Sequence, residues 1–378
     1  MRFTRLKLQN WRNFLDADVP LQKRAFLVGP NASGKSNFLE AFRFLRDIAE
    51  PKGSFQGAVE ARHGVSQIRS LHARRYPHVA VEVEVDLDSE GKWSYLLEFG
   101  QNNQRVPIIK RERVLHNSEL LVNRPDSEDA KDEKRLEQTY LEQLNANLSF
   151  RVLAEFFSQV RYLHLVPQLV REPERSQVKK VRDPFGGDFL EQLARTPRKT
   201  LESRLRRIKD ALQIAVPQLR ELVLERDKAT GVPHLKGLYE HWRPNAGWQM
   251  EDQLSDGTLR LLGLLWVFLD GTAPLLLEEP ELSLHASVVR QIPRMISRLG
   301  GRSGRQVLLS THSADMLSDE GIAPEEVLMF QPSREGTVVK AAAEDDQVRA
   351  LLEGDLTMAD AVIPRTAPAE ADQLVLFE

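Results

Sequence analysis

The chain has 378 residues, of which 41% are hydrophobic and 28% are charged. This composition supports a packed core and excludes a globally disordered chain. The length suits two or three folding units, or one large α/β domain with an insertion. The net charge of −3 excludes a bulk polycation, so any contact with nucleic acid must come from a local patch. Cysteine is absent, which excludes disulfides, iron–sulfur clusters, thiolate zinc sites and cysteine nucleophiles.

The sequence carries no pattern typical of a secretory or membrane segment. The N-terminal residues lack the apolar run of a signal peptide. The longest apolar stretch, residues 259–269, is too short to span a bilayer. We therefore expect a cytoplasmic protein without a membrane partner.

The N-terminal third predicts strands on both sides of one helix. Residues 1–9 alternate as in a strand, and residues 25–28 form the continuous apolar run typical of a strand buried on both faces. A helix with apolar residues at helical spacing follows from Ser33 and ends near Pro51. Residues 78–99 alternate in two runs around a polar turn and predict an antiparallel hairpin.

The rest of the chain predicts an irregular middle and then a return to α/β alternation. Residues 117–135 are charge-dense and predict an exposed loop or a frayed helix start, and residues 136–160 predict a helix in two pieces. Further elements are expected as helices at 189–216 (with a break near Pro197), 259–269 and 285–299, and as strands at 162–166, 219–225, 235–239, 275–277, 306–310, 327–330 and 337–340, the last two at a sheet edge.

Residues 29–36, Gly-Pro-Asn-Ala-Ser-Gly-Lys-Ser, match the phosphate-binding pattern G-x-x-x-x-G-K-[ST] between a predicted strand and a predicted helix. Glycines let backbone N–H groups surround phosphate oxygens, and the helix N-terminus adds a positive dipole. Lys35 would reach the β- and γ-phosphates of ATP, and the Ser36 hydroxyl would ligate Mg²⁺. The alternative is a chance glycine-rich turn. The expected nucleotide-binding residues are Gly29, Asn31, Ser33, Gly34, Lys35, Ser36 and Asn37.

Two further predicted strands end in groups suited to phosphate chemistry. Residues 275–280 deliver two carboxylates at the end of an apolar strand, where open parallel sheets bind ligands. Glu278 would support the metal, and Glu279 would act as the base that polarises the attacking water; the alternative is a solvated acidic loop. His312 ends the next strand and would sense the γ-phosphate or orient the water, although a lone histidine is more often structural.

Residues 254–260, Leu-Ser-Asp-Gly-Thr-Leu-Arg, precede an apolar helix. Ser255 or Asp256 suits a helix N-cap beside a tight turn at Gly257. The same geometry also makes a second phosphate cradle from a hydroxyl, a glycine N–H and a helix N-terminus. Because one phosphate rarely needs two cradles in one chain, this second cradle favours two chains that face each other.

The order of these motifs resembles the head of ABC-type ATPases, and more narrowly the RecF/SMC/OLD-like branch of them. Residues 10–14, Asn-Trp-Arg-Asn-Phe, resemble the N-terminal element of that branch. The loop at 29–37 resembles its Walker A motif down to the trailing Asn. Residues 254–260 and 278–285 are similar to its signature and to its Walker B and D-loop.

The resemblance implies a head-to-tail dimer that sandwiches two ATP molecules. In such a dimer, Ser255 and Gly257 of one subunit touch the γ-phosphate that Lys35 of the other subunit holds. Gln168 follows a predicted strand and stands where the family places a Q-loop glutamine, near the nucleotide and Mg²⁺. The alternative for Gln168 is an ordinary polar residue after Pro167.

Three positions depart from the pattern of ABC transporters: Glu278 replaces the Walker B Asp, His285 stands in place of the D-loop Asp, and Asp256 replaces a signature Gly. These departures argue against a transporter rather than against activity. The expected fold is α/β, an ABC-ATPase head with a mixed sheet around the P-loop core, an antiparallel β-subdomain and a helical insertion. The expected regions are an N-terminal ATPase lobe at 1–115, a mainly helical insertion at 116–215, a C-terminal ATPase lobe at 216–343 and an acidic tail at 344–378.

The expected partners follow from charge and from the resemblance. Residues 161–210 hold thirteen Lys and Arg residues against seven Asp and Glu. This stretch either contacts nucleic acid or is a solvated helix face, and it lacks the aromatic platforms that stack single strands. OLD-like relatives often carry a Toprim nuclease, but too few residues follow His312 for one.

The resemblance therefore implies an ATPase that assembles in even numbers around ATP and Mg²⁺. As a regulatory switch, it would control a separate effector, a Toprim-like nuclease or a toxin in anti-phage defence. The first alternative is a RecF-like ATPase that acts on DNA directly in repair. The second alternative is a scaffold in which ATP has only a structural role.

Overall fold

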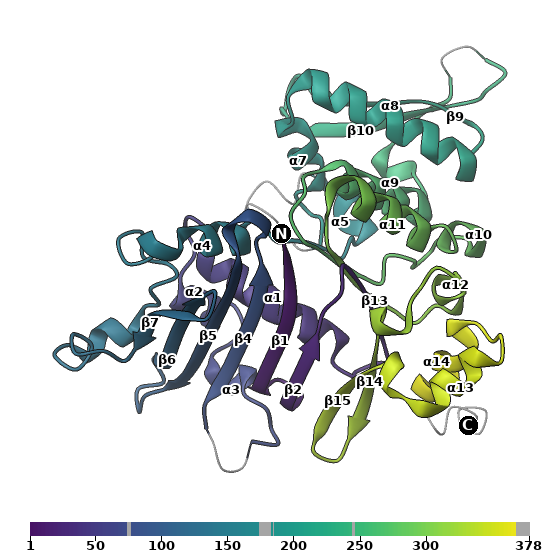
Figure 1. The fold of residues 1–378 in the computed structure, drawn as a ribbon. Coiled ribbons are helices and arrows are strands. Elements are labelled where there is room, and N and C mark those ends of the chain that lie inside the picture. The colour runs from purple at the N-terminus through teal and green to yellow at the C-terminus, as the bar shows by residue number, and fades with distance from the viewer. Residues whose placement is uncertain (74–76, 174–182, 184, 244–245, 368–378) are drawn as a thin grey trace, which may run out of the picture. The chain divides into compact units, whose positions relative to one another are not determined.

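The computed structural model of the protein describes residues 1–73, 77–173, 183, 185–243 and 246–367 (Figure 1). The chain forms two compact units, each built from segments that lie far apart in the sequence. Unit 1 contains Met1–Arg161, Ala273–Leu276 and Pro293–Glu378, and unit 2 contains Tyr162–Thr272 and Leu277–Ile292. Within the described ranges, no helix has both the length and the apolar content that a membrane span requires.

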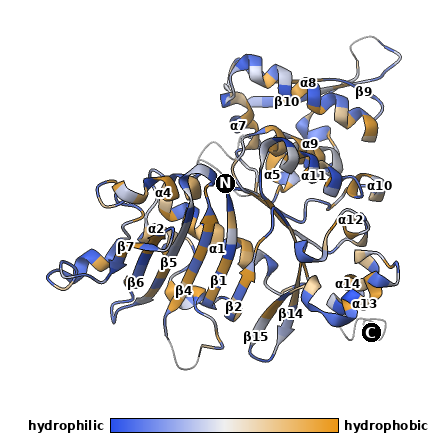
Figure 2. Ribbon diagram, viewed as in Figure 1, coloured by the Kyte–Doolittle hydropathy of each residue, from blue (hydrophilic) through white to orange (hydrophobic). Residues whose placement is uncertain are grey.

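Unit 1 contains an antiparallel sheet of six strands in the order β2-β1-β4-β5-β6-β7. The alternating valines from Val79 to Val85 are buried in it, whereas Glu82 and Glu84 stay half-exposed, so the predicted hairpin is confirmed. Figure 2 shows this alternation of hydropathy along the strands. The six strands are β1 (Arg2–Trp11), β2 (Phe14–Pro20), β4 (Val79–Asp86), β5 (Lys92–Gln101), β6 (Pro107–His116) and β7 (Glu119–Arg124).

A second sheet of six strands has the order β15-β14-β3-β13-β12-β8. Its central strand β3 is parallel to both neighbours, β13 and β14. Every residue of β13 is buried, as the apolar run predicts. Strand β14 lies between β15 and β3, so the prediction of an edge is wrong for β14 and holds for β15. The strands are β3 (Arg24–Val28), β8 (Arg161–Leu163), β12 (Leu275–Glu278), β13 (Val307–Thr311), β14 (Val327–Ser333) and β15 (Gly336–Ala341).

Helix α1 (Lys35–Ala49) joins the two sheets of unit 1 through its aromatic side chains. Phe42 contacts Phe3 of β1 at a ring-centroid distance of 4.7 Å. Phe38 contacts Phe330 of β14 at 5.4 Å. Because these rings are fully buried, the start of α1 is fixed against both sheets.

The other helices of unit 1 are shorter than α1, and two of them lie in the region expected as an acidic tail, residues 344–378. In this region α13 and α14 form because Val348 and Val362 supply buried apolar contacts. The apolar residues 374–377 lie outside the described residues. The helices are α2 (Phe55–Glu60), α3 (Val65–Ile68), α4 (Arg151–Ser158), α11 (Ile292–Ser303), α12 (Ala314–Leu317), α13 (Asp346–Glu353) and α14 (Met358–Thr366).

Unit 2 combines helices with a three-stranded antiparallel sheet in the order β11-β10-β9. The predicted helix break at Pro197 and the predicted strand pair around Gly231 are both confirmed. The expected helix at 285–299 is split into α10 and α11. The elements are α5 (Pro167–Arg171), α7 (Phe189–Arg195), α8 (Arg198–Ala215), β9 (Leu219–Arg226), β10 (Pro233–Tyr239), β11 (Trp248–Met250), α9 (Asp256–Leu269) and α10 (Ala286–Val289).

The stretch 117–160 differs most from expectation. Residues 117–135 were expected as an exposed loop or helix start, but β7 extends the antiparallel sheet there. Residues 136–160 were expected as two helices, but α4 is the only α-helix in that range. The physical reason is a buried network of charged groups, which holds the chain in turns and short 3-10 helices. The division of the whole chain into four regions stays a prediction.

This network centres on Arg124, whose guanidinium is fully buried. It forms ion pairs of 2.9 Å with both Glu112 and Asp129, and it lies 3.9 Å from the ring centroid of Tyr140. Burial raises the pKa of Asp129, but the hydrogen bond and charge of Arg124, together with hydrogen bonds from the Asp126 N–H and from Arg135, lower that pKa to about 2. The stability that Asp129 contributes is therefore present above pH of about 4 and is lost as the pH falls towards 2.

We predict that Arg124→Met lowers the free energy of unfolding by about 3–5 kcal/mol, because two carboxylates then stay buried without their cation. Urea denaturation at neutral pH measures this change. The matched control is Arg198→Met, since Arg198 pairs with Glu202 on the exposed surface of α8. An exposed pair is worth about 0–1 kcal/mol, so equal losses in the two variants would contradict the prediction.

Candidate nucleotide-binding site

The Walker A loop connects β3 to α1, and its glycines are required by close contacts. A Cβ on Gly29 would lie 2.6 Å from the carbonyl oxygen of Phe330. Gly34 has a φ of 96°, and a Cβ there would lie 2.1 Å from Nδ2 of Asn13. The loop therefore follows a path that side chains at these two positions would block.

The Lys35 side chain turns back into this loop. Its Nζ atom donates hydrogen bonds to the carbonyl oxygens of Gly29 at 2.8 Å and of Pro30 at 3.0 Å, and the residue is only 6% exposed. The Ser33 Oγ atom is also buried, and within the described ranges it has no hydrogen-bond partner. A buried ammonium beside a buried hydroxyl that lacks a partner suits an anionic ligand with several oxygen atoms.

The N-terminus of α1 has the character of an anion site. The N-cap residue is Gly34, and no side chain in the described part of the chain caps the helix. The first turn contains no acidic residue, and Ser36 lies exposed within it. The backbone dipole of the 15-residue helix α1 puts partial positive charge at this end. The loop and the helix N-terminus therefore both favour a bound phosphate.

His312 lies at the same end of the second sheet as the Walker A loop, where the parallel strands β3 and β13 both end. In the parallel register of β3 and β13, Val28 pairs with Thr311, so Gly29 and His312 are the next residues on neighbouring strands. His312 itself is exposed, and Ser313 caps α12. The structure therefore brings the predicted Walker A loop and the predicted histidine together at the carboxyl ends of two neighbouring parallel strands, β3 and β13.

The predicted Walker B carboxylates begin in unit 2 at the end of β12. Glu278 accepts a hydrogen bond from the Tyr162 hydroxyl of β8. Glu279 adopts a left-handed backbone conformation with a φ of 42°, which is uncommon for a residue other than glycine. Sequence reasoning did not select Tyr162, because it lies 116 positions from its partner.

The signature segment in unit 2 combines an N-cap with an ion pair. Ser255 caps α9 by accepting a hydrogen bond from the Thr258 N–H at 3.2 Å. Asp256 forms a 2.5 Å ion pair with Arg171, which also donates to the Leu254 carbonyl oxygen at 2.7 Å. Arg171 belongs to α5, the short helix that also carries the exposed candidate Gln168. The candidate Q-loop helix is thus bound to the signature.

Arg260 adds a second cation to this part of unit 2. Burial lowers the pKa of Arg260, and the carboxylates of Asp256, Glu279 and Glu281 raise it in part. Arg260 therefore lies within the electrostatic reach of both the signature and the Walker B end. Because an Arg side chain stays protonated, it offsets part of the negative charge that these carboxylates gather.

The predicted site residues fall into two sets, each described within its own unit. The loop residues and His312 belong to unit 1, and Gln168, Ser255, Gly257, Glu278 and Glu279 belong to unit 2. The described residues contain no group of three or more His, Asp or Glu placed to hold a metal ion. The donors predicted for Mg²⁺ are the hydroxyl of Ser36 and the carboxylate of Glu278, and oxygen donors of this kind suit Mg²⁺, which proteins bind through one or two side chains together with phosphates and water.

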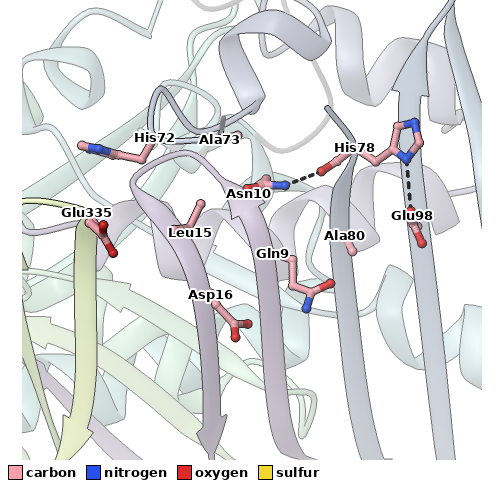
Figure 3. Close-up of a pocket in the computed structure, with 10 residues that line it drawn as sticks. All are labelled: Gln9, Asn10, Leu15, Asp16, His72, Ala73, His78, Ala80, Glu98 and Glu335. Carbon is pink, nitrogen blue, oxygen red and sulfur yellow. Dashed lines mark hydrogen bonds and ion pairs between the residues drawn. The ribbon is translucent and has the colours of Figure 1, made fainter. Parts of the chain in front are cut away.

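A cavity of about 580 Å³ lies elsewhere on unit 1, and Figure 3 shows the residues around it. Asn10 and His78 meet there, with Asn10 Nδ2 donating to the His78 carbonyl oxygen at 2.8 Å. The His78 ring lies 3.3 Å from a carboxylate oxygen of Glu98. None of the predicted site residues lines this cavity.

Comparison with protein families gives one match that spans most of the chain. The family described as "AAA domain, putative AbiEii toxin, Type IV TA system" matches residues 24–318. The matched range contains all of the predicted site residues. The chain therefore belongs to this family.

Two curated relatives match shorter parts of the chain. A DNA replication and repair protein RecF from Synechocystis sp. is 35% identical over 111 residues, which is 29% of this chain and 28% of the relative. An Endonuclease GajA from Bacillus cereus is 34% identical over 67 residues, which is 18% of this chain and 12% of the relative. The chain thus matches well under two thirds of the length of either relative.

Solved structures of SMC heads share the fold. An SMC head bound to the C-terminal winged-helix domain of ScpA has a TM-score of 0.53 at 14% identity, covering 90% of this chain and 97% of that one. An SMC head with an extended coiled coil, bound to the C-terminal domain of ScpA derived from Pyrococcus furiosus, has a TM-score of 0.52 at 12% identity, covering 93% and 99%. The fold is that of an ABC-type ATPase head, as the motifs predicted.

We predict that Gly257→Ala destabilises the protein, because the new Cβ would lie 2.5 Å from the carbonyl oxygen of Ser283. The expected loss is about 1–3 kcal/mol, visible as a lower melting temperature in a thermal scan. The matched control is Gly301→Ala in α11, where no atom beyond the adjoining backbone of that helix lies within 4 Å of the new Cβ. The prediction fails if both variants melt at the temperature of the parent.

Proposed function

We propose that this member of the AAA-domain family binds ATP with Mg²⁺, dimerises around it and hydrolyses it slowly as a switch for a separate effector protein. The observation that carries the proposal is the Walker A loop. Its buried ammonium and buried hydroxyl face the loop interior, and its helix N-terminus is free of acidic residues. These features suit a triphosphate better than any neutral ligand.

Each predicted side chain has a role in this reaction. Lys35 would bind the β- and γ-phosphate oxygens, and Ser36 and Glu278 would hold Mg²⁺. The Tyr162 hydroxyl donates a hydrogen bond to the Glu278 carboxylate and so orients it. Bound Mg²⁺ supplies charge neutralisation on the phosphates. Glu279 accepts a proton from the attacking water, and His312 contacts the γ-phosphate.

The remaining phosphate contacts come from a second copy in this proposal. Ser255 and Gly257 at the start of α9 bind the γ-phosphate held by the other subunit. A carboxylate at position 256 opposes an incoming anion, and the ion pair with Arg171 compensates that charge. Arg171 lies three residues after Gln168 on α5, so one short helix links the candidate Q-loop residue to the signature.

The effector role rests on the names of the family and of one relative. The family description mentions a toxin of a toxin–antitoxin system, and one relative is named an endonuclease. We propose that the effector is a nuclease or toxin carried by a separate chain, and that the ATP-bound dimer holds or releases it.

A second candidate function is direct action on DNA. One relative is named a DNA replication and repair protein. Helix α8 presents Lys199, Arg206 and Arg207 on its exposed surface, where they can contact phosphates. Three further cations of the basic stretch 161–210, Lys179, Lys180 and Arg182, lie outside the described residues.

We predict that Glu279→Gln accumulates a dimer that requires ATP, because the sandwich closes but hydrolysis no longer opens it. Light scattering after size exclusion, with and without ATP, measures the mass. A release assay for phosphate should show a loss of at least about 100-fold in rate.

Glu320→Gln is the matched control, since Glu320 is exposed in unit 1 and has no role in the proposed site. It should behave as the parent does in both assays. If neither the parent nor Glu279→Gln changes mass with ATP, dimerisation around ATP is wrong. If the parent hydrolyses no ATP, a scaffold with structural ATP replaces the switch.

If DNA is the direct partner, reversing the charge of Lys199, Arg206 and Arg207 to Glu should weaken DNA binding and reduce the salt slope of log K by about 3. Fluorescence anisotropy of a labelled duplex at several salt concentrations measures both quantities. Arg298→Glu with Arg302→Glu on the exposed face of α11 is the matched control. Equal binding by both variants and the parent would reject the α8 surface and favour the effector role.

A further inference from the structure

The segment Asn-Trp-Arg-Asn-Phe at residues 10–14 has no role in the proposed chemistry, yet it lies beside the Walker A loop. It forms the turn between β1 and β2, where Trp11 pairs with Phe14. The two residues at the tip differ in their contacts. Arg12 donates to the Gln67 carbonyl oxygen at 3.0 Å, away from the loop, whereas Asn13 points its amide at the loop.

Both ends of the Asn13 amide are used. Its oxygen accepts a hydrogen bond from Nδ2 of Asn37 at 3.0 Å, and its nitrogen donates to Oγ1 of Thr337 at 2.7 Å. Thr337 in turn donates from Oγ1 to the carbonyl oxygen of Ser33 at 2.8 Å. Asn13 is therefore bonded to the end of the loop directly, and to its middle through one buried hydroxyl.

Steric contacts fix the same arrangement. The Asn13 amide fills the space next to Gly34, because a Cβ added to Gly34 would lie 2.1 Å from Asn13 Nδ2. On the other side, Gly336 has a φ of 112°, and a Cβ there would lie 2.5 Å from the Asn13 carbonyl oxygen. That oxygen accepts a 2.8 Å hydrogen bond from the Thr337 N–H. The Asn13 turn is thus held between the Walker A loop and the hairpin of β14 and β15.

We propose that Asn13 is a positioning residue for nucleotide binding, acting through Asn37 and Thr337 to hold residues 33–37 in the phosphate-binding conformation. The inference rests on the proposed function, because it concerns the same loop. Backbone N–H groups bind phosphate well only when they already point inward, so a rigid support lowers the cost of binding. Two segments from opposite ends of the chain, the Asn13 turn and the hairpin that carries Thr337, supply that support.

Removing this support should weaken nucleotide binding more than it weakens the fold. Asn13→Ala deletes one direct and one relayed hydrogen bond to the loop, so we expect the dissociation constant for ADP to rise roughly 3- to 10-fold. The KM for ATP should rise by a similar factor, while kcat changes less, because Glu279 and the other reacting groups stay in place.

The experiment titrates ADP into the full chain by calorimetry and records a thermal scan of each variant. Asn10→Ala is the matched control: it removes an asparagine from the same segment whose amide bonds the His78 carbonyl beside the separate cavity of Figure 3. Asn10→Ala should bind ADP as the parent does. Thr337→Val removes the relaying hydroxyl and should weaken binding, whereas Thr337→Ser keeps the hydroxyl and should restore it.

The outcomes separate this inference from the proposed function. If the parent binds ADP and Asn13→Ala and Thr337→Val both bind it equally well, the positioning role is wrong and the proposed function stands. If Asn13→Ala loses affinity only in proportion to a loss of melting temperature that Asn10→Ala shares, the role is structural and the inference is also wrong. If the parent binds no ADP, the proposed function itself fails. Should Asn13→Ala not fold, the Thr337 pair decides alone.

Discussion

The buried ammonium of Lys35 is the group around which the Walker A loop is arranged. A charge that is almost fully removed from solvent needs compensation, and here the loop supplies it from its own carbonyl oxygens at Gly29 and Pro30. The loop must therefore curve around the side chain that follows it. That curvature needs Gly29 against Phe330 and Gly34 against Asn13, and it leaves the hydroxyl of Ser33 buried inside.

The surroundings of the loop keep this curvature in place from two sides. Below it, the rings of Phe14, Phe38 and Phe330 pack edge to face, with centroids 5.4–6.2 Å apart. Beside it, the Asn13 turn and Thr337 bond its backbone. In unit 2 the balance is electrostatic, since Arg171 and Arg260 offset the carboxylates of the signature and the Walker B end. Unit 1 thus supplies a rigid Walker A loop, and unit 2 supplies carboxylates whose negative charge is partly offset by Arg171 and Arg260.

Elements with a local signature could be predicted from the sequence, and contacts across large sequence distances could not. The Walker A loop between a buried strand and a helix follows from residues 25–49, because period and glycine spacing are local properties. Strand β2 has two aspartates among its seven residues, so its sequence did not predict a strand. It forms because it pairs with β1 along the sheet. In the stretch 117–135, charged residues indicated solvent exposure, but Arg124 and Asp129 are buried because they pair with each other.

The same limit applies to the candidate site. Lys35, Glu278 and Ser255 belong to recognisable patterns, so their positions could be predicted. Tyr162 and Arg171 could not, because their partners lie 116 and 85 positions away. Asn13 was part of a recognised segment, but its contact with Thr337 spans 324 positions and no pattern within the segment reveals it.

The central position of β3 also has a consequence for synthesis of the protein on the ribosome. The antiparallel sheet of unit 1 has all of its strands once residue 124 has emerged. Strand β3 is made early, but its two neighbours are Val307–Thr311 and Val327–Ser333. During translation the apolar strand β3 therefore has neither of its native neighbours until most of the chain has been synthesised. A nascent or truncated chain that lacks β13 and β14 leaves the apolar strand β3 without its native neighbours, and unpaired apolar strands of this kind are prone to aggregate.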